Sequence, residues 1–285
     1  KDRLLADLYF AARRALRERI GDPLPEAERV QEARASVREL MRALGHADAV
    51  IERQFSAMPD ESFVRFRPEQ LVWQATSLME VARGGTLVRA RRIAPESDAL
   101  EVFVHSPDRD GLFAAIVMTL DRAGYSIHRA RVLDGPEDTI FDTFEVTPAG
   151  SFADGDTARL ELLLRKALAG NILVLRPARR VIPRQLRHFR FAPRIEFIEN
   201  AEHARTVLNL VAPDRPGLLA DVAHVLRDQQ LRVQDARIAT FGERAEDQFQ
   251  LTDRHDRPLT ETSRQALRDA LLACLEPDRT PGDPR

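Results

Sequence analysis

The stretch Pro213-Asp214-Arg215-Pro216-Gly217-Leu218-Leu219 decides how the rest of this sequence is interpreted. It follows the apolar run 207–211 and precedes the segment 220–226, where apolar residues recur every three or four positions. Proline and glycine interrupt regular structure, so this order predicts a strand, a tight turn and an amphipathic helix.

The same pattern occurs once before, at Pro107-Asp108-Arg109-Asp110-Gly111-Leu112-Phe113. Asp108 and Asp214 lie 106 positions apart. The matches continue downstream at a spacing of 106 and then 105, in three pairs: Ala130 with Ala236, Asp142 with Asp247, and Phe144 with Phe249. A nearly constant spacing over several matches indicates two copies of one small domain.

The composition is that of an ordinary globular protein of two or three domains, with 285 residues, 44% apolar and 31% charged. A net charge of -2 gives no reason to expect binding to nucleic acid or to an anionic membrane. No apolar run approaches the ~20 residues that span a bilayer. With one cysteine and no secretory signal, the sequence predicts a cytoplasmic protein. The chain lacks an initiator methionine, so we expect it to be part of a longer one.

We divide the chain into four segments by the period of its apolar residues. Residues 1–85 have a helical period, and Pro68 suits a first helical position. Residues 86–175 and 193–285 hold the two copies, and the basic, proline-containing stretch 176–192 is their linker.

Each copy contains a strand, a helix, two strands and a second helix around its aspartate-arginine turn. A four-stranded sheet needs one more strand, and the apolar stretches 86–93 and 194–198 supply it from the front. We therefore predict the α+β class: a helical segment, then two ferredoxin-like domains, each a four-stranded antiparallel sheet covered by two helices. In the helix 157–169, four leucines are expected to be buried: Leu160, Leu163, Leu164 and Leu168.

Motifs for catalysis and metal binding are missing from the sequence. It has no Gly-x-x-x-x-Gly-Lys-Ser phosphate loop, no Gly-x-Gly-x-x-Gly and no Cys-x-x-Cys pair. The seven histidines are scattered, and His255-Asp256 lies in a polar turn without companion ligands. We expect no catalytic residue, metal site or cofactor in this chain.

The two turns carry the chemistry that remains. A helix N-terminus offers unpaired backbone N–H groups and a positive dipole end, which suit an anion. Gly111 and Gly217 allow close approach to the backbone, and Asp108 and Asp214 add a carboxylate. Together these groups suit a free α-amino acid. The alternative is that each turn is a plain helix cap.

The segments 100–144 and 207–249 resemble ACT domains, small regulatory modules that bind amino acids. The whole chain resembles the C-terminal part of the bacterial bifunctional uridylyltransferase/uridylyl-removing enzymes. This resemblance is carried by five stretches: 63–73 (Phe-Val-Arg-Phe-Arg-Pro-Glu-Gln-Leu-Val-Trp), 106–109, 120–122, 186–189 and 236–244.

The resemblance implies a regulatory region that senses L-glutamine. In those enzymes an N-terminal nucleotidyltransferase domain would use Mg²⁺ to move UMP from UTP to the nitrogen regulatory protein PII. A His-Asp hydrolase domain would remove it, and residues 1–82 would be the end of that region. The catalytic motifs would lie outside this chain, which would itself be inactive.

The resemblance also places glutamine at the strand–helix turns. The first turn would contribute Asp108, Arg109, Asp110, Gly111 and Leu112, and the second Asp214, Arg215, Pro216, Gly217 and Leu218. ACT domains often pair side by side, so 126–128 and 232–234 could close the sites. Asp110 stands where the second copy has Pro216, which adds an acid and favours the second site.

Two other functions fit the same sequence. The ACT pair could dock PII or a second chain without binding a small molecule, or it could serve a different host protein. The stretch 63–73 argues against the different host. Alanine at Gly217 should abolish ligand binding and leave the sheet-mediated interface intact, which would separate a sensor from a docking module in part.

Overall fold

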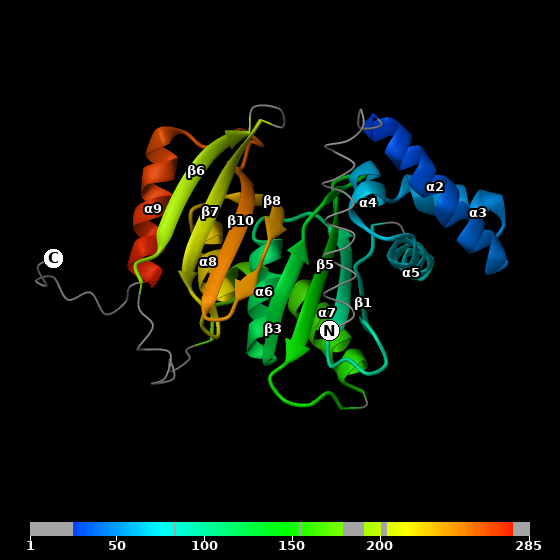
Figure 1. Cartoon of the computed structure of the whole chain (residues 1–285), viewed down its shortest axis with the longest axis horizontal. Helices are drawn as coiled ribbons and strands as arrows, with labels where there is room; N and C mark the ends of the chain where they lie inside the picture. Colours follow the sequence, from blue (N-terminus) through cyan, green and yellow to red (C-terminus); the bar gives the residue numbers. More distant parts are fainter. Residues whose placement is uncertain (1–24, 83, 154, 179–190, 201–203, 276–285) are drawn as a thin grey trace, which may run out of the picture. The chain divides into compact units, whose positions relative to one another are not determined.

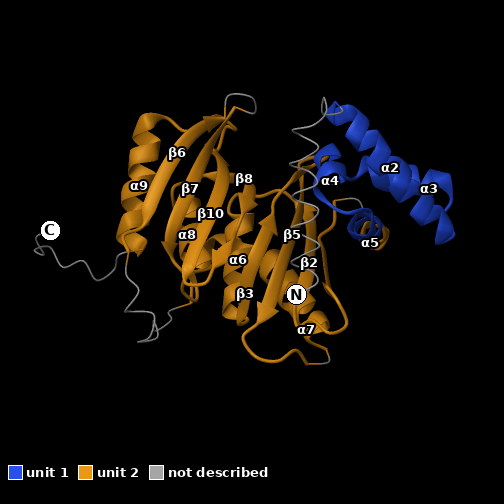
Figure 2. Cartoon of the chain, in the orientation of Figure 1, with its two compact units in different colours: residues 1–75 blue, residues 76–285 orange. Residues whose placement is uncertain are grey.

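The computed structural model describes residues 25–82, 84–153, 155–178, 191–200 and 204–275 (Figure 1). The helix expected before residue 25, most of the linker 176–192 and the tail after Leu275 lie outside these ranges. The chain divides into two compact units, residues 1–75 and 76–285 (Figure 2). No helix in the described part of the chain is both long and apolar enough to cross a membrane.

The first unit is helical. Its helices are α2 (Glu26–Ala43), α3 (Asp48–Ser56), α4 (Asp60–Arg65) and the start of α5 (Pro68–Leu78). Their apolar stripes meet in a small core, where the rings of Phe55 and Phe63 pack edge to face at 5.2 Å. Pro68 opens α5 as predicted, because a first helical position does not need its N–H.

The second unit begins with an antiparallel sheet that two helices cover on one face (Figure 1). Its strands follow the order β1-β2-β5-β3. In sequence the elements are β1 (Leu87–Arg92), β2 (Leu100–Pro107), α6 (Leu112–Arg122), β3 (Tyr125–Arg131), β4 (Asp134–Gly135), β5 (Thr139–Pro148), α7 (Asp156–Ala169) and the 3-10 turn η1 (Ile172–Val174).

The second sheet repeats this plan, with strand order β6-β7-β10-β8. Its elements are β6 (Arg194–Asn200), β7 (Arg205–Pro213), α8 (Leu218–Asp228), β8 (Arg232–Arg237), β9 (Thr240–Phe241), β10 (Arg244–Thr252) and α9 (Glu261–Leu275). In both sheets the strand before the turn pairs antiparallel with an extra strand from the front. The predicted fold, two ferredoxin-like domains with a fourth strand supplied from the front, is confirmed.

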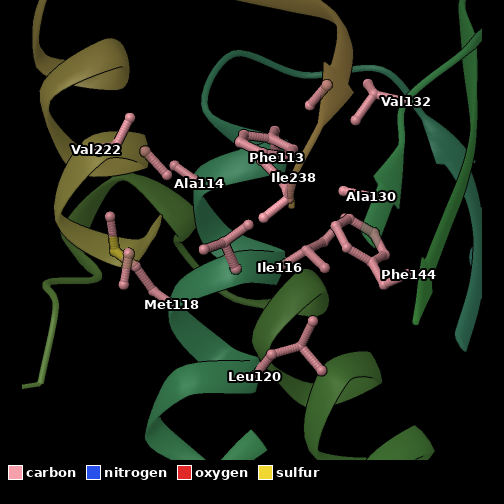
Figure 3. Packing of buried hydrophobic residues seen from close by; sticks show 14 of the residues in the cluster. Phe113, Ala114, Ile116, Met118, Leu120, Ala130, Val132, Phe144, Val222 and Ile238 are labelled. Atoms are coloured by element: carbon pink, nitrogen blue, oxygen red, sulfur yellow. The ribbon is translucent and has the colours of Figure 1, made fainter. Parts of the chain in front are cut away.

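One hydrophobic core joins the two domains. Helix α6 packs against α8, and strand β3 lies beside β8. In this core Met118 and Ala114 lie close to Val222 of α8 (Figure 3). The ring of Phe113 packs against Phe144 of its own domain and Phe249 of the other, with distances between ring centroids of 6.3 and 6.5 Å.

One expectation about burial was wrong. Leu160, Leu164 and Leu168 are buried in α7, but Leu163 is 37% exposed. The three buried leucines are spaced by four residues and form one stripe along the helix. Leu163 precedes Leu164 by one residue, so it points to a different side of the helix.

Candidate functional site

The two aspartate-arginine turns join a central strand to a helix that packs in the core. Gly111 and Gly217 are the residues before α6 and α8, with φ of 80° and 83°. A side chain disfavours this left-handed conformation by roughly 1–2 kcal/mol, so glycine is the suitable residue at both positions. Each turn therefore presents the N-terminus of an 11-residue helix beside an aspartate.

The structure brings each turn to the neighbouring domain. The first-turn cavity has a volume of about 50 Å³ and is lined by Asp108, Arg109, Asp110, Gly111 and Leu112. The opposite wall belongs to the second domain and includes Ala223, Leu226, Arg227, Leu231, Arg232 and Val233. All five residues predicted for the first turn thus face one space.

The second-turn cavity is the counterpart and is larger, with a volume of about 270 Å³. The turn contributes Asp214, Arg215, Pro216, Gly217 and Leu218. The first domain contributes α6 and β3 residues that include Val117, Asp121, Tyr125, Ser126, Ile127 and His128. Residues 126–128 line the second-turn cavity, and Arg232 and Val233 line the first-turn cavity, so each strand lies against the other domain's turn. Gln234 lines a neighbouring cavity instead.

Carboxylates dominate the electrostatics of the second-turn cavity. Burial raises the pKa of Asp214, although the Arg215 N–H and nearby His128 oppose that rise. Burial also raises the pKa of Asp247 to about 7, despite the hydrogen bond from the Ala239 backbone. Asp247 is 3% exposed, and its Oδ1 has no hydrogen-bond partner among the described residues.

Positive charge near this cavity is largely compensated. Arg215, in the turn before α8, forms an ion pair at 2.5 Å with Asp221 in the first turn of that helix. The Nε2 atom of His128 lies 2.7 Å from the hydroxyl oxygen of Thr147. Since Asp121, Asp214 and Asp247 all line the cavity, its field favours a cationic group.

The first-turn cavity has a different charge pattern. Arg232 donates to Asp108 Oδ2 and, through Nη1, to both Asp256 oxygens at 2.9 and 3.0 Å. Arg109 donates to the Leu168 carbonyl oxygen at 2.5 Å. Burial holds the pKa of Asp142, the counterpart of Asp247, well above its ordinary value. The Leu133 N–H donates to Asp142 Oδ1 at 3.3 Å.

Sequence analysis missed two kinds of residue at these cavities. Asp142 and Asp247 were matched as repeat positions but not assigned to the sites, and an aspartate kept in both copies on a buried strand was the available signal. Arg227 gave no such signal, because its contact with the first turn depends on how α8 packs against α6.

The described residues contain no group of three or more histidine, cysteine, aspartate or glutamate side chains arranged to hold a metal ion. The polar turn 253–257 is closed by its own hydrogen bonds, in which Asp253 accepts from His255 and Arg257. Asp256 is a partner of Arg232.

Comparisons with known proteins show which proteins this chain is similar to. Residues 25–77 match the family model described as the uridylyltransferase GlnD fifth domain, and residues 206–271 match the ACT domain. A bifunctional uridylyltransferase/uridylyl-removing enzyme of Xanthomonas axonopodis pv. citri is 72% identical over 97% of this chain. The chain is homologous to the C-terminal part of these enzymes. The predicted resemblance is confirmed.

The homology extends to more distant members. The enzyme of the same description from Pseudomonas savastanoi pv. phaseolicola is 31% identical over 98% of this chain. The chain spans about one third of the length of these relatives, since it covers 32% of each. Among solved structures, an aspartate kinase from Synechocystis is similar over 66% of this chain and 30% of its own, with 17% identity and a TM-score of 0.36.

Proposed function

We propose that residues 76–285 are the amino-acid sensor of a bifunctional uridylyltransferase/uridylyl-removing enzyme, and that the ligand is L-glutamine. The homology supports a regulatory role next to the catalytic domains of such an enzyme. One observation carries the choice of ligand class: the second-turn cavity combines a helix N-terminus with a buried carboxylate, Asp247, whose Oδ1 has no partner in the described part of the chain.

An α-amino acid satisfies both features at once. Its carboxylate would accept hydrogen bonds from the first N–H groups of α8, where the helix dipole is positive. Its ammonium would lie against Asp214 and Asp247. Leaving a buried carboxylate oxygen without a partner costs free energy, roughly 1–3 kcal/mol, which a docked ammonium would offset.

The charge of the cavity selects among amino acids. Asp121, Asp214 and Asp247 line it, and the Arg215 charge is compensated by Asp221. A second carboxylate on the ligand would meet repulsion of roughly 1–4 kcal/mol at contact distance. Glutamine has the shape of glutamate without that charge, so we expect at least about fivefold preference for glutamine.

In the longer protein this sensor would bias two opposing reactions. These are the Mg²⁺-dependent transfer of UMP from UTP to a tyrosine of PII, and its hydrolytic removal, both in the cytoplasm. Mg²⁺ would be held by the catalytic domains. Glutamine can favour removal of UMP only to the extent that it binds the removing state of the enzyme more tightly than the transferring state, typically by ~1–3 kcal/mol.

Calorimetric titration of this chain with glutamine, with glutamate as control, tests the proposal. We expect saturable binding of glutamine and binding of glutamate that is weaker by at least about fivefold. Gly217→Ala, which places a side chain at φ 83°, should weaken glutamine binding. Unchanged affinity in that variant would contradict the assigned site.

A docking role is the second candidate, favoured by one observation. Strand β6 is the end strand of its sheet, and Ile198 on it is 53% exposed. Such an edge can pair with another chain. Three results together would support docking over sensing. The folded chain would not bind glutamine, it would retain PII in a pull-down, and Ile198→Lys would lose PII.

A further inference from the structure

The two turns are equivalent by repeat but differ in what the opposite domain places against them. Helices α6 and α8 lie 106 positions apart, so Asp121 corresponds to Arg227 and Ser126 to Arg232. The second turn thus faces an aspartate and a serine, whereas the first turn faces two arginines.

Arg227 fills the space directly over the first turn. A Cβ on Gly111 would lie 2.9 Å from Arg227 Cδ, 3.0 Å from its Cγ and 3.3 Å from Leu173 Cδ2. The Arg227 side chain is 6% exposed and donates from Nη1 to the Leu175 carbonyl oxygen at 2.8 Å. The approach to the N-terminus of α6 is therefore taken by side chains of the protein itself.

Arg232 supplies the cation that a ligand would otherwise bring. Its guanidinium forms ion pairs with Asp108 on one side and Asp256 on the other, and its side chain is 30% exposed. A neighbouring cavity of about 310 Å³ also borders Asp108 and Arg232. Arg109, Gly111 and Leu112 do not line that cavity. That cavity therefore does not reach the N-terminus of α6.

We propose that the first turn is a closed joint between the two domains, held by Arg227 and Arg232, and that the second turn alone takes the amino acid. The chain then binds one ligand, not two. This inference rests on the proposed function for its ligand, but the joint itself can be tested without any ligand. The cavity volumes of about 50 and 270 Å³ agree with this division.

The joint is tested first by thermal unfolding of the whole chain in the absence of amino acids. Asp108→Asn and Arg232→Ser should each lower the Tm by about 2–4 °C, as expected for loss of ~1 kcal/mol in a chain of this size. The double variant should lose no more than Arg232→Ser alone, because Arg232→Ser already removes the ion pair with Asp108. Arg205→Ser is the matched control, since Arg205 lines the neighbouring cavity and pairs with Asp134 at 3.8 Å. Additive losses in the double variant would overturn the joint.

The division of roles is tested next by calorimetric titration with glutamine. We expect one site per chain, lost in Asp214→Asn and kept in Asp108→Asn. The double variant Arg227→Asp with Arg232→Ser gives the first turn the counterparts of Asp121 and Ser126, and it should permit a second, weaker binding event. Two sites in the unchanged chain, or loss of binding in Asp108→Asn alone, would overturn the inference while leaving a glutamine sensor. No binding to the folded, unchanged chain would instead contradict the proposed function and overturn the ligand part of this inference, leaving the joint to the unfolding test.

Discussion

At the scale of single residues, Asp247 is a carboxyl group whose environment differs strongly from water. It is a carboxylate on a central strand, 3% exposed, with a pKa of about 7 caused mainly by burial. A folded-state pKa above the unfolded value of 3.8 means that the folded chain binds the proton more tightly. Its contribution to stability is therefore greatest below pH 4 and is lost as the pH rises toward 7.

Asp247→Asn should remove this dependence. The free energy of unfolding of the unchanged chain should fall between about pH 4 and 7, by at most roughly 1.4 kcal/mol per pH unit from this group. Urea unfolding at pH 5 and at pH 7.5 measures this change. The free energy of unfolding of the variant should differ less between the two pH values than that of the unchanged chain. Asp110→Asn, at an exposed position, is the control. Parallel slopes in the unchanged chain and in Asp247→Asn would contradict the assignment.

Ligand binding should change the charge of the same residue. An ammonium placed beside Asp247 favours the ionised carboxylate, so binding near pH 6 should release protons. Asp214, Asp121, His128 and Arg215 also line this cavity. Titrations in two buffers with different heats of ionisation should give different binding heats. Equal heats would show that Asp247 does not meet the ammonium.

Gly111 is constrained by its conformation and by its neighbour. Gly111→Ala should destabilise the chain by about 1–3 kcal/mol, from left-handed strain and from displacement of the Arg227 stem. Gly124→Ala is a matched control, because Gly124 has φ 83° but no atom within 4 Å of an added Cβ. Denaturant unfolding of both variants separates strain from crowding. A larger loss in Gly124→Ala would contradict the contact with Arg227.

At the scale of elements, Phe113 on α6 links the two domains through its contacts with Phe144 and Phe249. Phe113→Ala should cost about 3–5 kcal/mol, as for other buried aromatic truncations. Leu163→Ala, on the exposed side of α7, should cost less than about 1 kcal/mol. Chemical denaturation measures both, and similar losses would be incompatible with the packing.

The elements were largely predictable because each follows from a local pattern. The turns at 107–113 and 213–219, the helices after them and the extra front strands are marked by periodicity, glycine, proline and the repeat itself. The predicted turn residues face the two cavities for the same reason. Closure of the first turn was not predictable, because Arg227 and Arg232 are ordinary surface-type residues until α8 is packed on α6. Leu163 was misjudged because a run of leucines hides which face of α7 is inside.

At the scale of the whole molecule, the two ACT domains share one hydrophobic core. They should therefore open together and not one after the other. Native-state hydrogen exchange should give the amides of β2 and β7 the same free energy of opening and the same denaturant dependence. Loss of protection in β7 and α8 at a denaturant concentration that leaves β2 and α6 protected would contradict a common core.

The front position of β1 and β6 has a consequence for how the sheets are assembled. In the β-α-β-β-α-β order, the last strand of the domain is the edge strand, and it pairs with the first strand of the same domain, far away in sequence. Here Arg92 pairs with Leu100, and Asn200 pairs with Arg205, so the edge strand finds its partner across a few residues. Short loops close at little entropic cost, and low contact order accompanies fast folding. During synthesis, each sheet can thus start from a hairpin that leaves the ribosome before either of its helices.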